Sequence, residues 1–375
     1  MAIEILFSVA VLLIFAKIFG EIAERLKMPS LVGEIIGGAA AGAMNFVSPS
    51  PLLAELAGLG MLFVVFLIGL GTNMEELKGR IRQGGSLAAM GAVLSFIAGF
   101  FVGYYAYGLA TGIVLGIVLA ATSSQIALRA VSSVGELHSK AGKMIMSAAA
   151  ANDIISMVAI ATAAAYFSFP GEIWKVATIF LGLSLLIAVI LALAKSAGKL
   201  LRLVEEIHDD QFVVAGALVA LFLLSYATQS AGIAAVGGAF AAGLLLSRTP
   251  LTEGVIQPKI KTVANGFFIP LFFAYLALQL DFGVQLQLVA LMLLLGVAAK
   301  FAGSWLLGAY YGLRGRERIT AGAASLPRGE ISIITAYIAA AAGAISAQAF
   351  TAVVMFSLLS IVLTSVIFHF WLKQW

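Results

Sequence analysis

Six ionisable side chains lie inside long apolar stretches of the sequence. Three are acidic and three are basic: Glu34, Asp153, Glu330, Lys17, Lys300 and Arg328. A charged side chain at the centre of a bilayer costs at least about 2.5–3.5 kcal/mol. If the stretches cross a membrane, each of these groups therefore needs a partner or a role in handling ions or protons.

Asp153 has the surroundings expected of an ion-binding carboxylate. It follows four alanines and Asn152 in the middle of an apolar stretch, and the small side chains leave space around it. Removal from water disfavours the charged form of a carboxyl group, so a proton and a partly dehydrated cation are expected to compete for its oxygens. Asn152, Thr122 and Ser123 offer the further oxygen ligands that a hard cation prefers. The pattern predicts one site that holds either a cation or a proton.

Polar segments interrupt two apolar stretches, and each interruption predicts a broken helix. One is Thr122 to Ser124, and the other is Leu326 to Glu330, which places Pro, Arg, Gly and Glu at membrane depth. Where two broken helices meet, carbonyl ends and N–H ends face one another, and Arg328 and Glu330 carry charges that balance them. The alternatives are hydroxyl groups that bond back within a continuous helix, and a second segment that is a loop outside the membrane.

Lys300 is the other charge for which a functional role is expected, because it lies in the middle of the apolar run V-A-A-K-F-A-G. It either pairs with a site carboxylate or loses its proton when the site is loaded. The structural alternative is a lysine that reaches the membrane surface or ties two helices together. Glu34 lies near the end of its stretch and is expected to reach water, and the three histidines lie in or beside loops without metal-site spacing.

The composition identifies the elements that must position these residues as membrane helices. Of 375 residues, 62% are hydrophobic and only 11% are charged, whereas soluble domains carry roughly 25% charged residues. The mean hydropathy is +1.08. The fold class is therefore an all-α polytopic membrane protein without a soluble regulatory domain. The absence of cysteine excludes disulfides, thiolate metal sites and thiol catalysis, and no cofactor is expected.

Apolar runs predict about thirteen transmembrane helices. Lys and Arg gather in alternate loops, beginning with Arg25 and Lys27, so the positive-inside rule places the N-terminus outside and the C-terminus in the cytoplasm. This distribution also explains the net charge of +4 without nucleic acid as a partner. The expected location is a prokaryotic inner membrane. The predicted spans are 4–26, 30–47, 52–71, 84–107, 109–128, 144–167, 173–194, 211–229, 231–247, 262–280, 285–312, 319–343 and 347–372.

An odd number of spans allows two inverted six-helix repeats, at about 1–170 and 210–375, joined by a linking helix at about 171–197. The two interrupted stretches then occupy the fifth helix of each repeat. Inverted repeats place the substrate site near the midplane, where discontinuous helices from the two halves meet. We therefore expect crossed discontinuous helices beside Asp153.

Several motifs in order resemble one family, the monovalent cation:proton antiporter-2 family of sodium/proton and potassium/proton exchangers. They are L-K-M-P-S-L-V-G-E-I-I-G-G at 26–38, F-L-I-G-L at 66–70, Asn152-Asp153, Lys300, and P-R-G-E at 327–330. The resemblance covers essentially the whole chain. It implies thirteen helices in a dimerisation domain and a core domain, a homodimer in lipid, ion binding at Asp153, and elevator-like movement of the core.

One departure from the family pattern concerns stoichiometry. Electrogenic members have two adjacent aspartates, whereas this chain has Asn152 before Asp153 and in this respect resembles exchangers that move one proton per cation. The expectation is electroneutral exchange of Na⁺ or K⁺ for H⁺, in the service of pH homeostasis. Lys300 remains, although the electroneutral exchangers often lack that lysine.

Other classes of function remain open from the sequence. The main alternative is a sodium-coupled symporter of an organic anion on a similar inverted-repeat fold, with Arg328 as the counter-charge and a roomier polar cavity. A gated cation channel is a further class, but this sequence shows no repeated filter segment of the kind that such a channel would need. An enzyme is not expected, because an intramembrane aspartyl protease needs two catalytic aspartates in separate spans, and only Asp153 is suitably placed.

Overall fold

The structure is a computed structural model that describes residues 2–72, 74–169, 172, 174, 176–178, 180–182, 184–185, 209–247, 249, 251–281, 283 and 286–372. Regular structure in these ranges is helical, without a strand. Nine helices among them are long and apolar enough to cross a membrane. An all-helical membrane fold is thereby confirmed. The count of thirteen stays a prediction, and most of the predicted linking helix lies outside the described residues.

The chain forms two compact units. The first comprises 1–25, 30–72 and 164–279, and the second comprises 26–29, 73–163 and 280–375. Each unit takes segments from both predicted halves, so the compact units do not coincide with the halves. The inverted relation between the halves stays a prediction.

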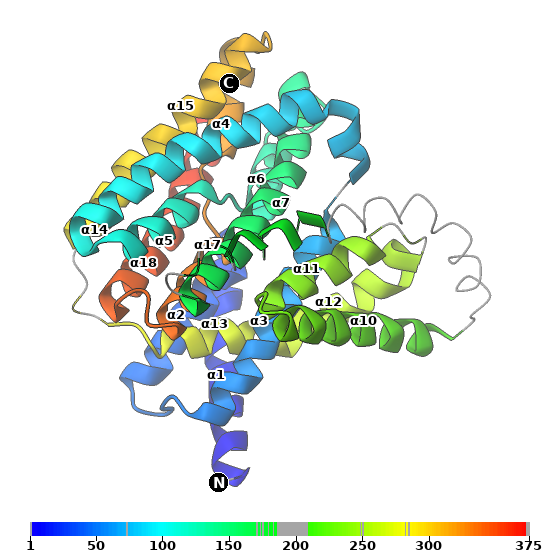
Figure 1. Cartoon of the computed structure of the whole chain (residues 1–375), viewed down its shortest axis with the longest axis vertical. Coiled ribbons are helices and arrows are strands. Elements are labelled where there is room, and N and C mark those ends of the chain that lie inside the picture. The colour runs from blue at the N-terminus through cyan, green and yellow to red at the C-terminus, as the bar shows by residue number, and fades with distance from the viewer. Residues whose placement is uncertain are drawn as a thin grey trace. The chain divides into compact units, whose positions relative to one another are not determined.

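The first unit is built on helices α1, α2, α3, α10, α11, α12 and α13 (Figure 1). α2 packs between α1 and α13, and α3 packs against α11 and α13. Lys17 on α1 donates a hydrogen bond to the backbone oxygen of Asn265, so this membrane-depth charge ties two segments of the unit together. The bounds are α1 (Ala2–Arg25), α2 (Ser30–Ala43), α3 (Pro51–Gly71), α10 (Asp210–Ser230), α11 (Ala235–Leu246), η1 (Thr252–Ile256), α12 (Gln257–Val263), η2 (Ala264–Phe268) and α13 (Ile269–Ala277).

The second unit carries both predicted helix breaks. α4 packs along α5 and α15, and α17 packs against α5 and α18. The close approach of α4 to α5 requires Gly99, because a methyl group there would overlap the backbone carbonyl of Leu115. The bounds are α4 (Met74–Tyr107), α5 (Leu109–Ala120), α6 (Ser124–Ser133), α7 (Lys140–Ser168), α14 (Leu286–Leu291), η3 (Met292–Gly296), α15 (Val297–Tyr310), α16 (Gly315–Ala324), α17 (Glu330–Ala341), α18 (Ala347–Val366) and η4 (Ile367–Leu372).

The two breaks lie directly against each other. α5 ends at Ala120 and α6 begins at Ser124, while α16 ends at Ala324 and α17 begins at Glu330. The backbone N–H of Ser123 donates to the carbonyl of Pro327 at 2.8 Å. The alternative of a continuous helix is therefore wrong for the first segment. The second segment is not a solvated loop, because residues 326–329 are buried, and its depth in the membrane stays a prediction.

Candidate functional site

The end of α5 presents three successive backbone carbonyls that lack partners within their own helix, because the helix stops there. The carbonyl of Val118 accepts a hydrogen bond from Ser332 Oγ at 3.0 Å. The next two, at Leu119 and Ala120, accept from the side chains of Arg328 and Lys300. Two basic side chains thus lie where the carbonyl end of a helix carries partial negative charge.

Arg328 joins the carbonyl ends of both broken helices. Its Nε donates to Leu119 of α5 at 3.1 Å, and its Nη1 donates to Ser325 and Leu326 beyond α16 at 2.8 and 2.6 Å. The residue is completely buried, and its backbone N–H donates to Ser360 Oγ on α18 at 2.9 Å. A guanidinium has its donors in a rigid planar fork, which suits several carbonyls that converge from two chain segments.

Glu330 lies at the N-terminal ends of α6 and α17, opposite the carbonyl ends of α5 and α16. It is in the first turn of α17 and accepts hydrogen bonds from the hydroxyl of Ser123, the N-cap residue of α6, at 3.1 and 3.3 Å. The N-termini of two helices carry partial positive charge, and one carboxylate there compensates both. The Ser123 hydroxyl, predicted as a cation ligand, is thus directed to Glu330.

Lys300 contacts a backbone carbonyl rather than a carboxylate, so it is not an ion-pair partner among the described residues. It is 1% exposed on α15, and its Nζ donates to the carbonyl of Ala120. This contact ties α15 to the end of α5, as in the structural alternative. In the described part of the chain it has no salt bridge to a carboxylate, which agrees with Asn152 in place of a second aspartate.

Asp153 lies on α7 beside the start of α6. The residue is 6% exposed, and its Oδ1 accepts a hydrogen bond from Ser124 Oγ at 2.6 Å. Ser124 also approaches the backbone carbonyl of Ala149, at 3.1 Å, one turn earlier on α7. This hydroxyl therefore fixes the carboxylate against the first helix break.

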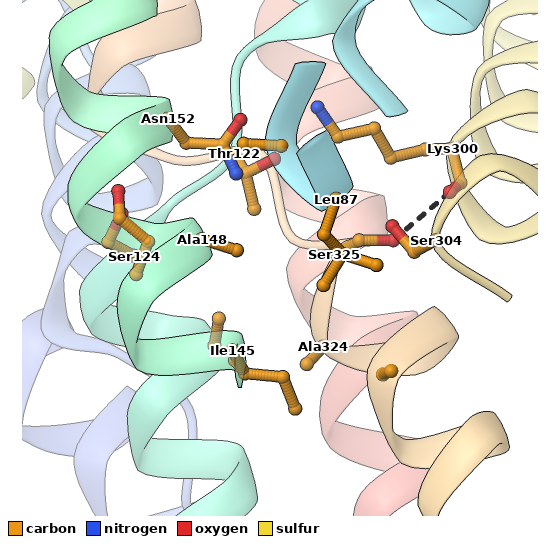
Figure 2. A pocket seen from close by; sticks show the side chains of 14 residues that line it. Leu87, Thr122, Ser124, Ile145, Ala148, Asn152, Lys300, Ser304, Ala324 and Ser325 are labelled. Atoms are coloured by element: carbon orange, nitrogen blue, oxygen red, sulfur yellow. Dashed lines mark hydrogen bonds between the residues drawn. The ribbon is translucent and has the colours of Figure 1, made fainter. Parts of the chain in front are cut away.

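A cavity lies inside the second unit, between α4, α6, α7, α15 and α16 (Figure 2). Asn152 and Thr122 line it on one side and Lys300 on the other. The remaining lining residues are Leu87, Ala88, Ser124, Ala127, Ile145, Ala148, Ala149, Ser304, Ala321, Ala324 and Ser325. A side-chain to backbone bond from Ser325 to the carbonyl of Lys300, 3.3 Å long, closes one edge. Six of the fourteen lining residues are alanine, and these small side chains leave space near Asp153.

Two polar atoms at this cavity have unused hydrogen-bonding capacity. Asn152 Oδ1 and Thr122 Oγ1 are buried, and the described residues supply neither with a partner. An unsatisfied buried polar atom costs about 1–3 kcal/mol, so such atoms usually bond to water or a ligand. Both side chains thereby have an oxygen that can accept a hydrogen bond or bind a ligand, and their role as cation ligands stays a prediction.

All seven site residues that the sequence singles out lie in the second unit and gather around the two breaks. The sequence motifs did not indicate that Ser124 contacts Asp153, although Ser124 belongs to the predicted helix break. Its neighbours Thr122 and Ser123 share its chemistry, so residue type alone does not separate them. Glu34 and Lys17 lie in the first unit, and Glu34 is buried at 3% exposure rather than open to water.

Comparison with known proteins supports this architecture. Residues 10–374 match the family described as "Sodium/hydrogen exchanger, transmembrane". The chain is 28% identical over 355 residues to the probable Na⁺/H⁺ antiporter GerT of Bacillus cereus, covering 93% of this chain and 94% of that protein. It is 26% identical over 370 residues to the Na⁺/H⁺-K⁺ antiporter GerN of the same organism, covering 97% and 95%.

A solved structure shares the fold. The sodium proton antiporter MjNhaP1 from Methanocaldococcus jannaschii superposes with a TM-score of 0.75 at 18% identity, covering 97% of both chains. At that identity the likeness concerns the fold alone, whereas the family match extends over nearly the entire sequence. This chain belongs to the transmembrane sodium/hydrogen exchanger family.

Proposed function

We propose that this protein exchanges a monovalent cation, Na⁺ or K⁺, for H⁺ across a membrane, and that Asp153 binds the two in turn. The observation that carries the proposal is the buried Asp153 carboxylate, held by Ser124 beside two interrupted helices. The related proteins GerT and GerN are named as antiporters of these ions, and the family match extends from residue 10 to 374.

The competition follows from the surroundings of the carboxylate. A buried carboxylate is costly unless a proton or a counter-ion neutralises it. Thr122 and Asn152 have side-chain oxygens without partners among the described residues, and these are the neutral ligands that a partly dehydrated cation needs. Since one carboxylate neutralises one positive charge, cation and proton exclude each other.

The stoichiometry in this proposal is one proton per cation. Asn152 does not titrate, and Lys300 is engaged with the Ala120 carbonyl rather than with a carboxylate. Exchange of one charge for one charge moves no net charge across the membrane. Strong dependence of the rate on an imposed membrane potential would contradict this part of the proposal.

The proposed cycle alternates access to Asp153 by elevator-like movement of the second unit. The division of the chain into two compact units, with the site residues all in one of them, supports this choice. The proposed setting is a homodimer in a prokaryotic inner membrane, with the N-terminus outside and the basic loops in the cytoplasm. Symport of an organic anion has less support, because Arg328 does not line the cavity in the described structure and two of its three nitrogens, Nε and Nη1, donate to backbone carbonyls, which leaves Nη2 alone unpaired.

The decisive experiment uses purified protein in liposomes with a pH-sensitive dye inside. Addition of Na⁺ or K⁺ outside should change the internal pH with wild type, and Asp153→Asn should abolish the change. Asp210→Asn is the matched control, because Asp210 is half exposed at 55% and paired with Lys259 on the first unit. Exchange that survives in Asp153→Asn at the rate of the control would refute the proposal.

A further inference from the structure

One end of the second unit is strongly basic. Three segments contribute to it: the start of α4 at 80–86, the stretch from α6 into α7 at 129–143, and the turn from α15 into α16 at 311–318. They carry eight Lys and Arg residues but only two acidic residues, Glu136 and Glu317. The basic residues are Arg80, Arg82, Arg129, Lys140, Lys143, Arg314, Arg316 and Arg318.

Tyr311 joins the three segments. Its hydroxyl lies 2.9 Å from Ser86 Oγ and donates to the carbonyl of Arg82 at 3.2 Å. Its own carbonyl accepts a hydrogen bond from Lys140 Nζ at 2.8 Å. Arg314, three residues further on, is the N-cap residue of α16. Basic residues from three segments are thereby fixed around one turn instead of being spread over separate loops.

Half of the basic residues at this end have side chains without a partner. Arg316 pairs with Glu136 at 3.2 Å, and Arg318 Nε donates to the carbonyl of Trp305 at 2.9 Å. Four others are exposed, and the described ranges supply their side chains with neither an ion pair nor a hydrogen bond: Arg82, Arg129, Lys143 and Arg314. A guanidinium presents its donors in a planar fork that matches the oxygens of a phosphate group, so the free arginines suit a phosphate.

The surface that adjoins this end is apolar. α4 and α15 lie side by side (Figure 1), and Ile81, Leu306 and Tyr310 are exposed on them, Tyr310 at 74%. Tyrosine is enriched where the hydrocarbon of a membrane meets the headgroups. The basic residues beside Tyr310 are therefore expected at the depth of the lipid phosphates.

We propose that an anionic phospholipid binds at this end of the second unit. Its acyl chains follow the exposed faces of α4 and α15, and its phosphate lies between Arg82, Lys140 and Arg314. Lys140 gives one N–H to Tyr311 and has two more for the phosphate. A zwitterionic lipid fits less well, because its own positive group would meet the same basic residues. This interaction goes beyond cation exchange and does not depend on which ions are exchanged.

The positive-inside bias also gathers Lys and Arg at one end of a membrane protein. That bias concerns the number of basic residues in a loop. It does not require three segments to converge on one turn, or an exposed tyrosine and an apolar face beside them. A surface with charge alone would attract every anion, whereas a lipid site should prefer an anionic lipid to a soluble phosphate.

The first test uses Trp305 as a reporter of bound lipid. The guanidinium carbon of Arg318 lies 3.2 Å from the centre of its ring, so the indole is close to the basic end. The other three tryptophans are replaced in Trp174→Phe, Trp371→Phe and Trp375→Phe. Protein in phosphatidylcholine nanodiscs is titrated with phosphatidylglycerol whose acyl chains are brominated, and in parallel with brominated phosphatidylcholine. The brominated phosphatidylglycerol should quench Trp305 at a clearly lower mole fraction.

A double variant tests the residues that hold the phosphate. Arg82→Gln with Arg314→Gln should raise the mole fraction for half-quenching by at least about tenfold, because each basic residue near an anionic lipid contributes about fivefold. Arg25→Gln with Lys261→Gln is the matched control. It removes two exposed positive charges from the first unit and should shift the titration by less than about twofold.

Three results of this titration would overturn the proposal. Equal quenching by the two brominated lipids would show no preference for an anionic headgroup. Equal shifts in the two double variants would reduce the effect to general attraction of charge. Displacement of phosphatidylglycerol by an equal concentration of inorganic phosphate would make the site one for soluble anions.

The second test measures stability. A ligand that binds the folded protein alone raises its stability, so phosphatidylglycerol added to detergent-solubilised wild type should raise Tm above the value with phosphatidylcholine. The rise should persist in Arg25→Gln with Lys261→Gln and disappear in Arg82→Gln with Arg314→Gln. The same rise in both double variants would contradict the proposed site. Neither test measures transport, so their outcome is independent of the proposed exchange.

Discussion

Replacement of Arg328 by methionine should destabilise the second unit more than replacement of any exposed arginine. Arg328 is completely buried and donates to the backbone carbonyls of Leu119, Ser325 and Leu326. Methionine fills a similar volume without a donor. The carbonyls at the ends of both broken helices would then lose the guanidinium that donates hydrogen bonds to them.

The magnitude follows from the number of acceptors. Each buried acceptor left without a donor costs about 1–3 kcal/mol, and three such acceptors would cost roughly 3–9 kcal/mol. Loss of the buried charge removes its own desolvation cost, and replacement of buried ions by apolar groups is often favourable by about 1–4 kcal/mol. We therefore expect a net loss near the lower end of the range, about 3 kcal/mol.

The assay is thermal unfolding of detergent-solubilised protein, followed by loss of the monodisperse peak after heating. Arg129→Met is the matched control, because Arg129 is exposed on α6 of the same unit, where substitutions usually change stability by at most about 0.5 kcal/mol. Arg328→Met should lower Tm by clearly more than this control. Equal Tm values for the two variants would refute the account of Arg328 as the joint between the helix ends.

Two further outcomes follow from contacts in the same unit. Gly99→Ala should lower Tm in the same assay, because the added methyl group would overlap the Leu115 carbonyl. Gly85→Ala on the same helix is the control: its methyl group meets only Ile81 at 4.0 Å and should raise stability by up to about 1 kcal/mol. An unchanged Tm in Gly99→Ala would show that α4 and α5 separate easily. Lys300→Gln should lower the free energy of unfolding by about 1–3 kcal/mol, because the Ala120 carbonyl loses the Lys300 donor. The variant should still exchange Na⁺ for H⁺ in liposomes. Complete loss of exchange in a folded variant would show that Lys300 takes part in ion binding or proton transfer.

The membrane fold and the helix breaks were predictable from residue types. Long continuous apolar stretches with few charges indicate helices, because about 20 such residues cross a membrane as a helix in which each backbone group finds its partner within the segment. Consecutive hydroxyl residues at 122–124 and the P-R-G-E segment at 327–330 interrupt such helices for local reasons. These features depend on neighbours in sequence, and the structure confirms both breaks.

The partners of the buried groups were not predictable in the same way. Thr122, Ser123 and Ser124 have similar side chains, yet one hydroxyl is unpaired within the described structure, one bonds to Glu330 and one bonds to Asp153. Their directions depend on how the two breaks meet, which involves residues about two hundred positions apart.

Composition and residue order suffice to place Asp153 as a lone carboxylate next to a non-titrating Asn152 in an apolar helix. The contacts of Asp153 with Ser124, of Lys300 with a carbonyl and of Arg328 with two helix ends come from the packing of the folded chain. They could not be foreseen because a hydrogen bond acts over about 3 Å. Its partner is whatever group the packing of distant segments brings within that reach.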